Sequence, residues 1–148
     1  MIPSIRLGLA TLALLALSAA TLAPIAAAHG RAEAVGLYIA LRPLCHQRPE
    51  RSWSYRELPV GLCIRCYGLH AGIFAAALLG LPFRPRLAAA GVAALGSIWA
   101  VEHLGGADVS QLARFASGCG FGLALTSLGS YSQKNRPKPS PTMPRRIL

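Results

Sequence analysis

The chain alternates long apolar stretches with short polar ones. Four stretches consist almost entirely of apolar residues, and they span residues 7–28, 67–83, 87–104 and 115–131. A bilayer core of about 30 Å requires roughly 20 mostly apolar helical residues. Alanine and leucine dominate these stretches, and a helix satisfies its own backbone hydrogen bonds in lipid. The pattern predicts an all-α integral membrane protein, a small bundle of four transmembrane helices with one long ordered loop at residues 29–66.

The first apolar stretch permits two interpretations. Arg6 precedes it, and Ala26 and Ala28 before His29 fit the small-x-small rule of a signal-peptide cleavage site. The stretch is nevertheless longer than the usual apolar core of a signal peptide, about 7 to 15 residues, and it can cross a bilayer. We predict that residues 1–28 form the first transmembrane helix. The alternative is a cleaved signal peptide, which would leave three helices.

Composition agrees with the membrane class and constrains the partners. Of the 148 residues, 53% are hydrophobic and 14% are charged, with a mean hydropathy of +0.45, which is too apolar for a soluble domain of this size. The net charge is +10. A basic, proline-rich tail at residues 132–148 is predicted to be disordered and to contact anionic lipid headgroups. No nucleic-acid-binding motif accompanies the charge, so the expected partners are membrane lipids, with a second membrane protein as a further candidate.

The basic residues also suggest an orientation. Arg6, Arg84, Arg86 and the tail are assigned to the cytoplasmic side, as the positive-inside rule favours. Residues 29–66 then lie outside the cytoplasm, and residues 67–131 form three further helices with short turns. The predicted location is the bacterial inner membrane, crossed several times.

Cysteine and histidine are concentrated in the long loop. Seventeen residues separate Cys45 from Cys63, and Cys63 and Cys66 form a C-x-x-C pair. Cysteine and histidine at such separations are typical tetrahedral zinc ligands. We predict a metal site formed by Cys45, His46, Cys63 and Cys66, with zinc as the candidate cofactor. His70 is an alternative to His46 because a helix that begins near residue 63 would place it on the same face as both cysteines.

The same thiols allow other chemistry. In an oxidising compartment Cys63 and Cys66 could form a disulfide, with Cys45 as a resolving thiol. The three cysteines could also have no joint role. A c-type haem is excluded because Tyr67, and no histidine, follows Cys66.

A second cluster in the loop is basic. Arginine guanidinium groups bind phosphate and carboxylate through two parallel hydrogen bonds, so Arg48, Arg51 and Arg65 are candidates to bind an anionic lipid headgroup. The alternative is ion pairing with Glu50 and Glu57. Farther along the chain, the segment from Glu102 to Arg114 flanks the last predicted turn on the same side of the membrane, and its ionisable residues could pair with the loop.

Two motifs carry a family resemblance. Residues 44–53 read L-C-H-Q-R-P-E-R-S-W, and Leu58-Pro59-Val60 precedes C-I-R-C-Y-G at residues 63–68. These motifs resemble a family of small predicted bacterial membrane proteins catalogued as a domain of unknown function, with the pattern C-H-Q-x-P-x-R-S and then P-V-C-x-R-C-x-G. Residues 111–118 resemble its arginine-glycine segment. Two additional residues, Gly61 and Leu62, separate Val60 from Cys63. Glu102 is the nearest candidate for the family's acidic position in the third span.

The resemblance implies a membrane protein with a cysteine-histidine loop and implies no reaction. The leading functional prediction is therefore metal binding or thiol redox chemistry at the membrane surface. A protein or enzyme that binds an anionic lipid or precursor is one alternative. An assembly factor for a membrane complex is another, and no catalytic residue is assigned.

Overall fold

The computed structural model describes residues 3–81, 84–106 and 108–134, with side chains up to residue 127. Five α-helices dominate it: α1 (Pro3–Ala28), α2 (Glu33–Leu41), α3 (Ile64–Leu79), α4 (Pro85–Leu104) and α5 (Gln111–Lys134). A 3-10 turn, η1 (Pro49–Arg51), and a two-stranded hairpin of β1 (Ser54–Tyr55) and β2 (Leu58–Pro59) lie between α2 and α3. The helical class predicted from the sequence is confirmed.

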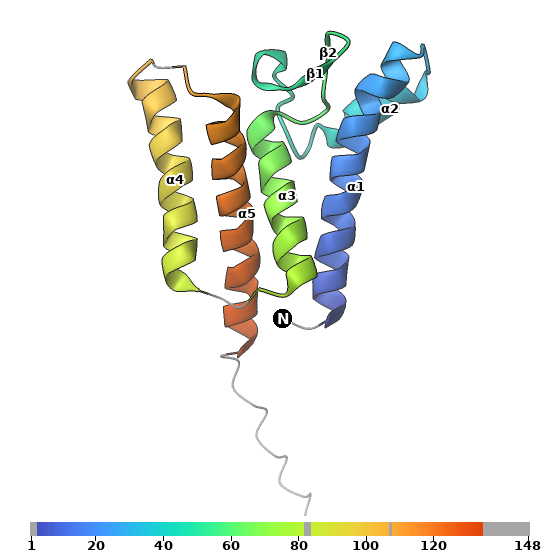
Figure 1. Cartoon of the computed structure of the whole chain (residues 1–148). Coiled ribbons are helices and arrows are strands. Elements are labelled where there is room, and N and C mark those ends of the chain that lie inside the picture. Colours follow the sequence, from blue (N-terminus) through green and yellow to red (C-terminus); the bar gives the residue numbers. More distant parts are fainter. Residues whose placement is uncertain (1–2, 82–83, 107, 135–148) are drawn as a thin grey trace, which may run out of the picture.

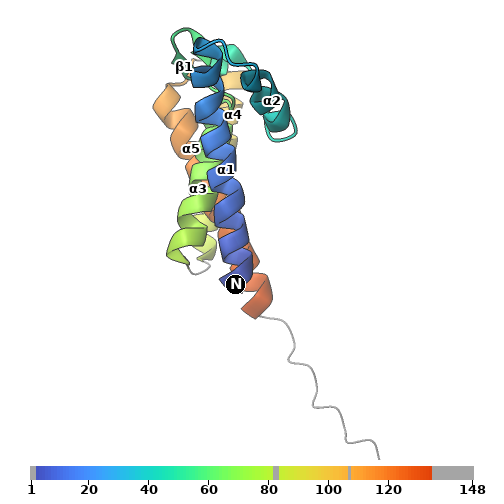
Figure 2. The same ribbon diagram turned by 90° about the vertical axis from the view of Figure 1, so that its right-hand side faces the viewer.

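The four long helices form a single layer. They lie side by side in the order α4, α5, α3, α1 (Figure 1), and the view turned by 90° shows the layer nearly edge-on (Figure 2). The predicted bundle is thus a flat one, in which the helices lie side by side. The residues buried along these helices are mainly alanine and glycine, which let helix pairs approach closely but provide no large side chains to fill a common centre.

Helices α3 and α5 approach most closely through glycine. A Cβ atom added at any of four glycines would overlap a backbone carbonyl oxygen of the facing helix; these are Gly68, Gly72, Gly118 and Gly122. The absence of a side chain at these positions is thus what allows the two helix backbones to come into direct contact. A larger side chain at any of them would force the two helices apart.

Two of the four predicted spans meet the length and composition needed to cross a membrane. They are α1, with 26 residues, and α4, with 20 residues. Helix α3 is apolar but shorter, with 16 residues. The long loop is more structured than predicted, because it contains α2 and because α3 begins at residue 64. Helix α5 continues to Lys134, and the rest of the predicted tail lies outside the described residues.

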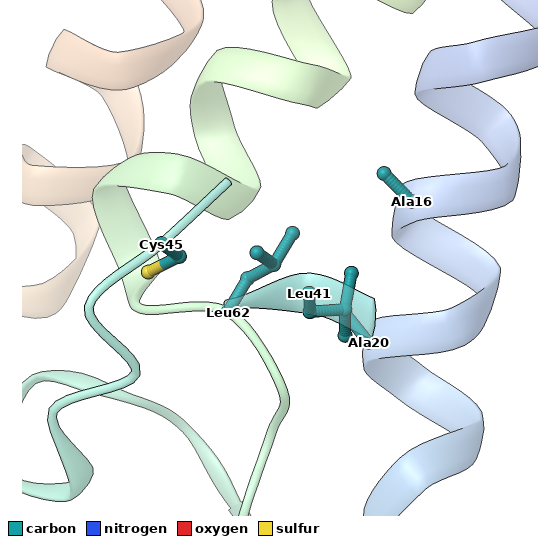
Figure 3. Close-up of a cluster of buried hydrophobic side chains, with 5 residues drawn as sticks. All are labelled: Ala16, Ala20, Leu41, Cys45 and Leu62. Atoms are coloured by element: carbon teal, nitrogen blue, oxygen red, sulfur yellow. The ribbon is translucent and has the colours of Figure 1, made fainter. Parts of the chain in front are cut away.

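The segment before α3 is anchored on α1. The backbone N–H of Gly61 donates to the Ala20 carbonyl oxygen at 3.0 Å. Figure 3 shows the buried cluster formed there by Ala16 and Ala20 of α1, Leu41 of α2, and Cys45 and Leu62 of the connecting chain. Burial of these apolar groups is the force that fixes the loop at one end of the layer.

Candidate functional site

The end of α2 directs Cys45 into the protein. The Cys45 N–H donates to the Leu41 carbonyl oxygen at 3.1 Å, which continues the turn of α2, and the Cys45 residue is only 5% exposed. Two backbone N–H groups donate to its Sγ atom, from Cys63 at 3.2 Å and from Gln47 at 3.4 Å. Such donors stabilise a thiolate.

The first turn of α3 supplies the other two thiols. Cys63 is the N-cap residue of the helix and has an extended backbone, while Cys66 lies one turn later. Their Sγ atoms are 3.3 Å apart. The unpaired N–H groups at a helix N-terminus carry partial positive charge, which favours thiolates at this position.

The three sulfur atoms converge. The Sγ atoms of Cys45, Cys63 and Cys66 all lie within 4.8 Å of one another. Tetrahedral zinc with Zn–S bonds of about 2.3 Å holds its sulfur ligands about 3.8 Å apart. The triangle of thiols therefore has the dimensions of a zinc-thiolate site, and it could hold a metal ion.

The pKa values of the Cys45 and Cys63 thiols are shifted in opposite directions. Hydrogen bonds from the thiols of Cys63 and Cys66, followed by those from backbone N–H groups, lower the pKa of the Cys45 thiol to about 2, although burial opposes the shift. The hydrogen bond between Cys63 and Cys45 raises the pKa of Cys63. A second thiolate would lie against the first, so the cluster disfavours a second negative charge when no cation is bound. A divalent cation would remove this restriction.

His46 is placed apart from the thiols. It is exposed, and within the described part of the chain the group of mutually close ligand atoms contains the three cysteines and no histidine. His46 lines a cavity to which Cys63 also contributes. His70, the alternative, is also outside the group, and its Nδ1 atom lies 2.8 Å from the Cys66 carbonyl oxygen.

The predicted arginine cluster lines the same cavity. The cavity has a volume of about 290 Å³, and its wall consists of His46, Arg48, Arg51, Cys63, Arg65, Trp99, His103 and Arg114. The three arginines chosen from the sequence are thus brought together. Arg114, at the start of α5, also lines the cavity but was not predicted to belong to the cluster. Its position in the last predicted turn, on the same side of the membrane as the loop, was the sequence signal that could have identified it.

A buried carboxylate organises two of these arginines. Glu102, near the end of α4, has a side chain only 5% exposed and forms ion pairs with Arg65 of α3 and, at 2.5 Å, with Arg114 of α5. Arg114 also pairs with the exposed Asp108 at 2.8 Å. Neither Glu50 nor Glu57 is in an ion pair among the described residues, so the expected alternative for the loop arginines is not observed.

Gln47 and Gly61 were missed as structural determinants of the site. The Gln47 side-chain amide donates to the carbonyl oxygens of Tyr38 at 2.7 Å and Gly61 at 3.0 Å, which joins α2 to the chain before Cys63. A Cβ atom on Gly61 would lie 2.6 Å from Leu41 Cδ1 and 3.2 Å from the Ala20 Cα atom. The two additional residues before Cys63 are thus the ones that dock this segment on α1.

Comparison with known proteins gives one result. A family model described as "Predicted membrane protein (DUF2085)" matches residues 45–128, which is more than half of the 148 residues. The match begins at Cys45 and covers both cysteine motifs and most of the chain from α3 to α5. No curated protein and no solved structure matches the chain. The chain belongs to the DUF2085 family of predicted membrane proteins.

Proposed function

We propose that this membrane protein binds a zinc ion through Cys45, Cys63 and Cys66. His46, whose side chain is exposed and lies apart from the three thiols, would turn toward them to become the fourth ligand. The observation that carries the proposal is the triangle of Sγ atoms, all within 4.8 Å of one another. Two backbone N–H groups already donate to the Cys45 Sγ atom. Hydrogen bonds of this kind orient a ligating thiolate and stabilise its charge.

The convergence of three thiols favours a metal over a disulfide. A disulfide would use only two of the three sulfur atoms. A zinc ion uses all three and compensates two of the three negative charges of the thiolates. The ion would join the chain after α2 to the first turn of α3, and so fix the loop that forms one wall of the basic cavity.

His46 is proposed as the fourth ligand because it lines the same cavity as Cys63. His70 is the alternative, because only its Nδ1 atom is engaged, by the Cys66 carbonyl oxygen at 2.8 Å, and its Nε2 atom is left to bind a metal. A comparison of His46→Ala with His70→Ala tests this choice. We expect His46→Ala to lower zinc retention during dialysis more than His70→Ala does, and the reverse order would make His70 the ligand.

The zinc content of the purified full chain tests the site itself. Protein in detergent should contain about one zinc per chain, and each of Cys45→Ser, Cys63→Ser and Cys66→Ser should lose it. Cys119→Ser is the matched control, because Cys119 is a free thiol on α5 outside the cluster. The three cluster thiols should react with an alkylating reagent after a chelator is added. Free alkylation of all three without chelator or reductant would disprove the proposal.

Thiol redox chemistry is the second candidate, and one distance favours it. The Sγ atoms of Cys63 and Cys66 are 3.3 Å apart at a helix N-terminus, where reactive C-x-x-C pairs occur. In that case a reductant, and not a chelator, would expose the two thiols to alkylation. The protein would then contain no zinc after purification.

The proposal includes a topology with four spans in a bacterial inner membrane and the cysteine loop outside the cytoplasm. It is supported by the directions of the four long helices, which alternate in chain order from α1 through α3 and α4 to α5 (Figure 1). Arg6, Arg84 and Arg86 belong to the end opposite the cysteines. A reporter fused after Leu148 should report the cytoplasm, and one inserted near Glu33 should report the outside. A cytoplasmic signal from Glu33 would reverse the orientation.

A further inference from the structure

The cavity beside the cysteines carries an excess of positive charge. Four arginines and two histidines line it, and no acidic residue of the described chain is among the lining residues. Glu102 lies behind the wall and compensates part of the charge of Arg65 and Arg114. With the exposed Asp108, which also pairs with Arg114, two carboxylates face four guanidinium groups. The cavity is thus suited to an anion.

Two of the arginines have no carboxylate partner. In residues 3–81, 84–106 and 108–127, no acidic oxygen lies within 4.0 Å of Arg48 or Arg51. Both belong to the short segment around η1, and Arg51 is partly buried. A partly buried guanidinium group that faces other cations is unfavourable unless an anion joins it. The partly buried Arg51 therefore favours a negative ligand in the cavity, and the exposed Arg48 lines the same cavity.

Arg65 provides an independent sign of a missing acceptor. Its Nη2 atom pairs with Glu102, but its Nε atom is buried and has no hydrogen-bond partner among the described residues. Buried donors in native proteins are almost always paired, with a protein group, water or a ligand. An unpaired donor on a residue of the cavity wall indicates an acceptor that binds there.

We propose that this cavity binds a phosphate group. Arg48 and Arg51 would contact the phosphate from the loop, and Arg65 of α3 and Arg114 of α5 would contact it from the helices. Glu102 is a positioning residue, because its ion pairs hold Arg65 and Arg114 in place. Guanidinium groups match phosphate oxygens in pairs, which makes arginine the preferred residue for this ligand. The volume of about 290 Å³ is at the lower limit of small-molecule pockets, so the ligand is one small phosphate-bearing group.

The phosphate group can belong to a lipid headgroup or be free in solution. Trp99 and His103 of α4 line the cavity with their rings stacked, at a centroid separation of 4.6 Å. Tryptophan is frequent at the level of lipid headgroups. The proposal does not depend on a metal at the cysteines, since no thiol is required to bind the anion.

Two probes distinguish the sources. Inorganic phosphate is titrated into the full chain in a sugar-based non-ionic detergent by calorimetry, and phosphatidylglycerol binding is measured by native mass spectrometry against diacylglycerol, which lacks the phosphate group. Binding of inorganic phosphate supports a free ligand. Preferential retention of phosphatidylglycerol without phosphate binding supports a headgroup. If neither probe binds, the proposal is wrong.

Matched variants test the residues. Arg48→Lys combined with Arg51→Lys keeps the charge but removes the paired donors, and we expect binding of the effective probe to weaken about tenfold or more. Arg42→Lys combined with Arg56→Lys is the control, because both arginines are exposed and neither lines the cavity. Equal weakening in both double variants would overturn the proposal in favour of general surface charge. Zinc content should be the same in both, so failure of the metal site would be recognised separately.

Discussion

The buried carboxylate of Glu102 offers the sharpest test of how the cavity is held together. Glu102→Gln keeps the shape of the side chain but removes its charge. Arg65 and Arg114 would then face each other with an uncharged group between them, and the only remaining acidic partner described is Asp108, whose side chain is 94% exposed. Three helices meet at this carboxylate, so its loss should affect the whole end of the layer.

The burial of the three side chains determines the magnitude. Exposure is 5% for Glu102, 18% for Arg65 and 14% for Arg114, so solvent screens these charges little. Removal of one partner from a buried ion pair typically costs about 3 to 5 kcal/mol, because the remaining charge is left uncompensated. Asp108→Asn removes the exposed partner of Arg114 and should cost only about 0 to 1 kcal/mol.

Unfolding by SDS in mixed micelles, followed by circular dichroism, compares the two variants with the wild-type chain. We expect the free energy of unfolding to fall by several kcal/mol for Glu102→Gln and to change little for Asp108→Asn. Arg65→Gln combined with Glu102→Gln should cost less than the sum of the two single changes, since they remove the same interaction. Equal effects of Glu102→Gln and Asp108→Asn would refute the reasoning.

Three further outcomes follow from the loop. Gly61→Ala should destabilise the protein by about 1 to 3 kcal/mol, because the added Cβ atom would overlap Leu41. Gly36→Ala in α2 is the control, because no atom lies within 4 Å of the added Cβ atom, and it should be neutral or stabilising in the same SDS titration. Gln47→Ala should cost about 1 to 3 kcal/mol because two carbonyl oxygens lose their donor; thermal unfolding would show it. Bound zinc should be released as the pH falls, because protons compete for thiolates, and zinc content that does not change on acidification would contradict thiolate ligation.

Much of the site could be predicted from local spacing. Cys63 and Cys66 are neighbours on one helix turn, so their proximity follows from the sequence. The return of Cys45 was expected because seventeen residues of one loop separate it from Cys63. The pairing of Glu102 with Arg65 was foreseeable because ionisable residues near helix ends seek partners in a membrane. These inferences depend on distances along the chain and on the cost of unpaired charge.

Other features depend on packing that the sequence does not display. The order of the helices in the layer depends on which faces of small residues pack against each other. These faces belong to helices that are distant in the chain. The separation of His46 from the thiols has a local cause: Cys45 is buried, so its neighbour is directed outward, and the left-handed backbone of Gln47, with φ of 50°, then turns the chain. Cysteine and histidine spacing alone could not reveal this divergence.

The arginine within C-I-R-C links the two halves of the site. Successive residues of a helix are rotated by about 100°, so Arg65 lies about 100° from Cys66 around the axis of α3. The two cysteines meet Cys45 from the loop, while Arg65 turns toward Glu102 of α4. One helix turn thus connects the thiol cluster to the ion pairs of α4 and α5, and residues from both line the same cavity. A ligand in that cavity would contact the loop and three helices together, because the lining residues come from the loop, from α3, from α4 and from α5.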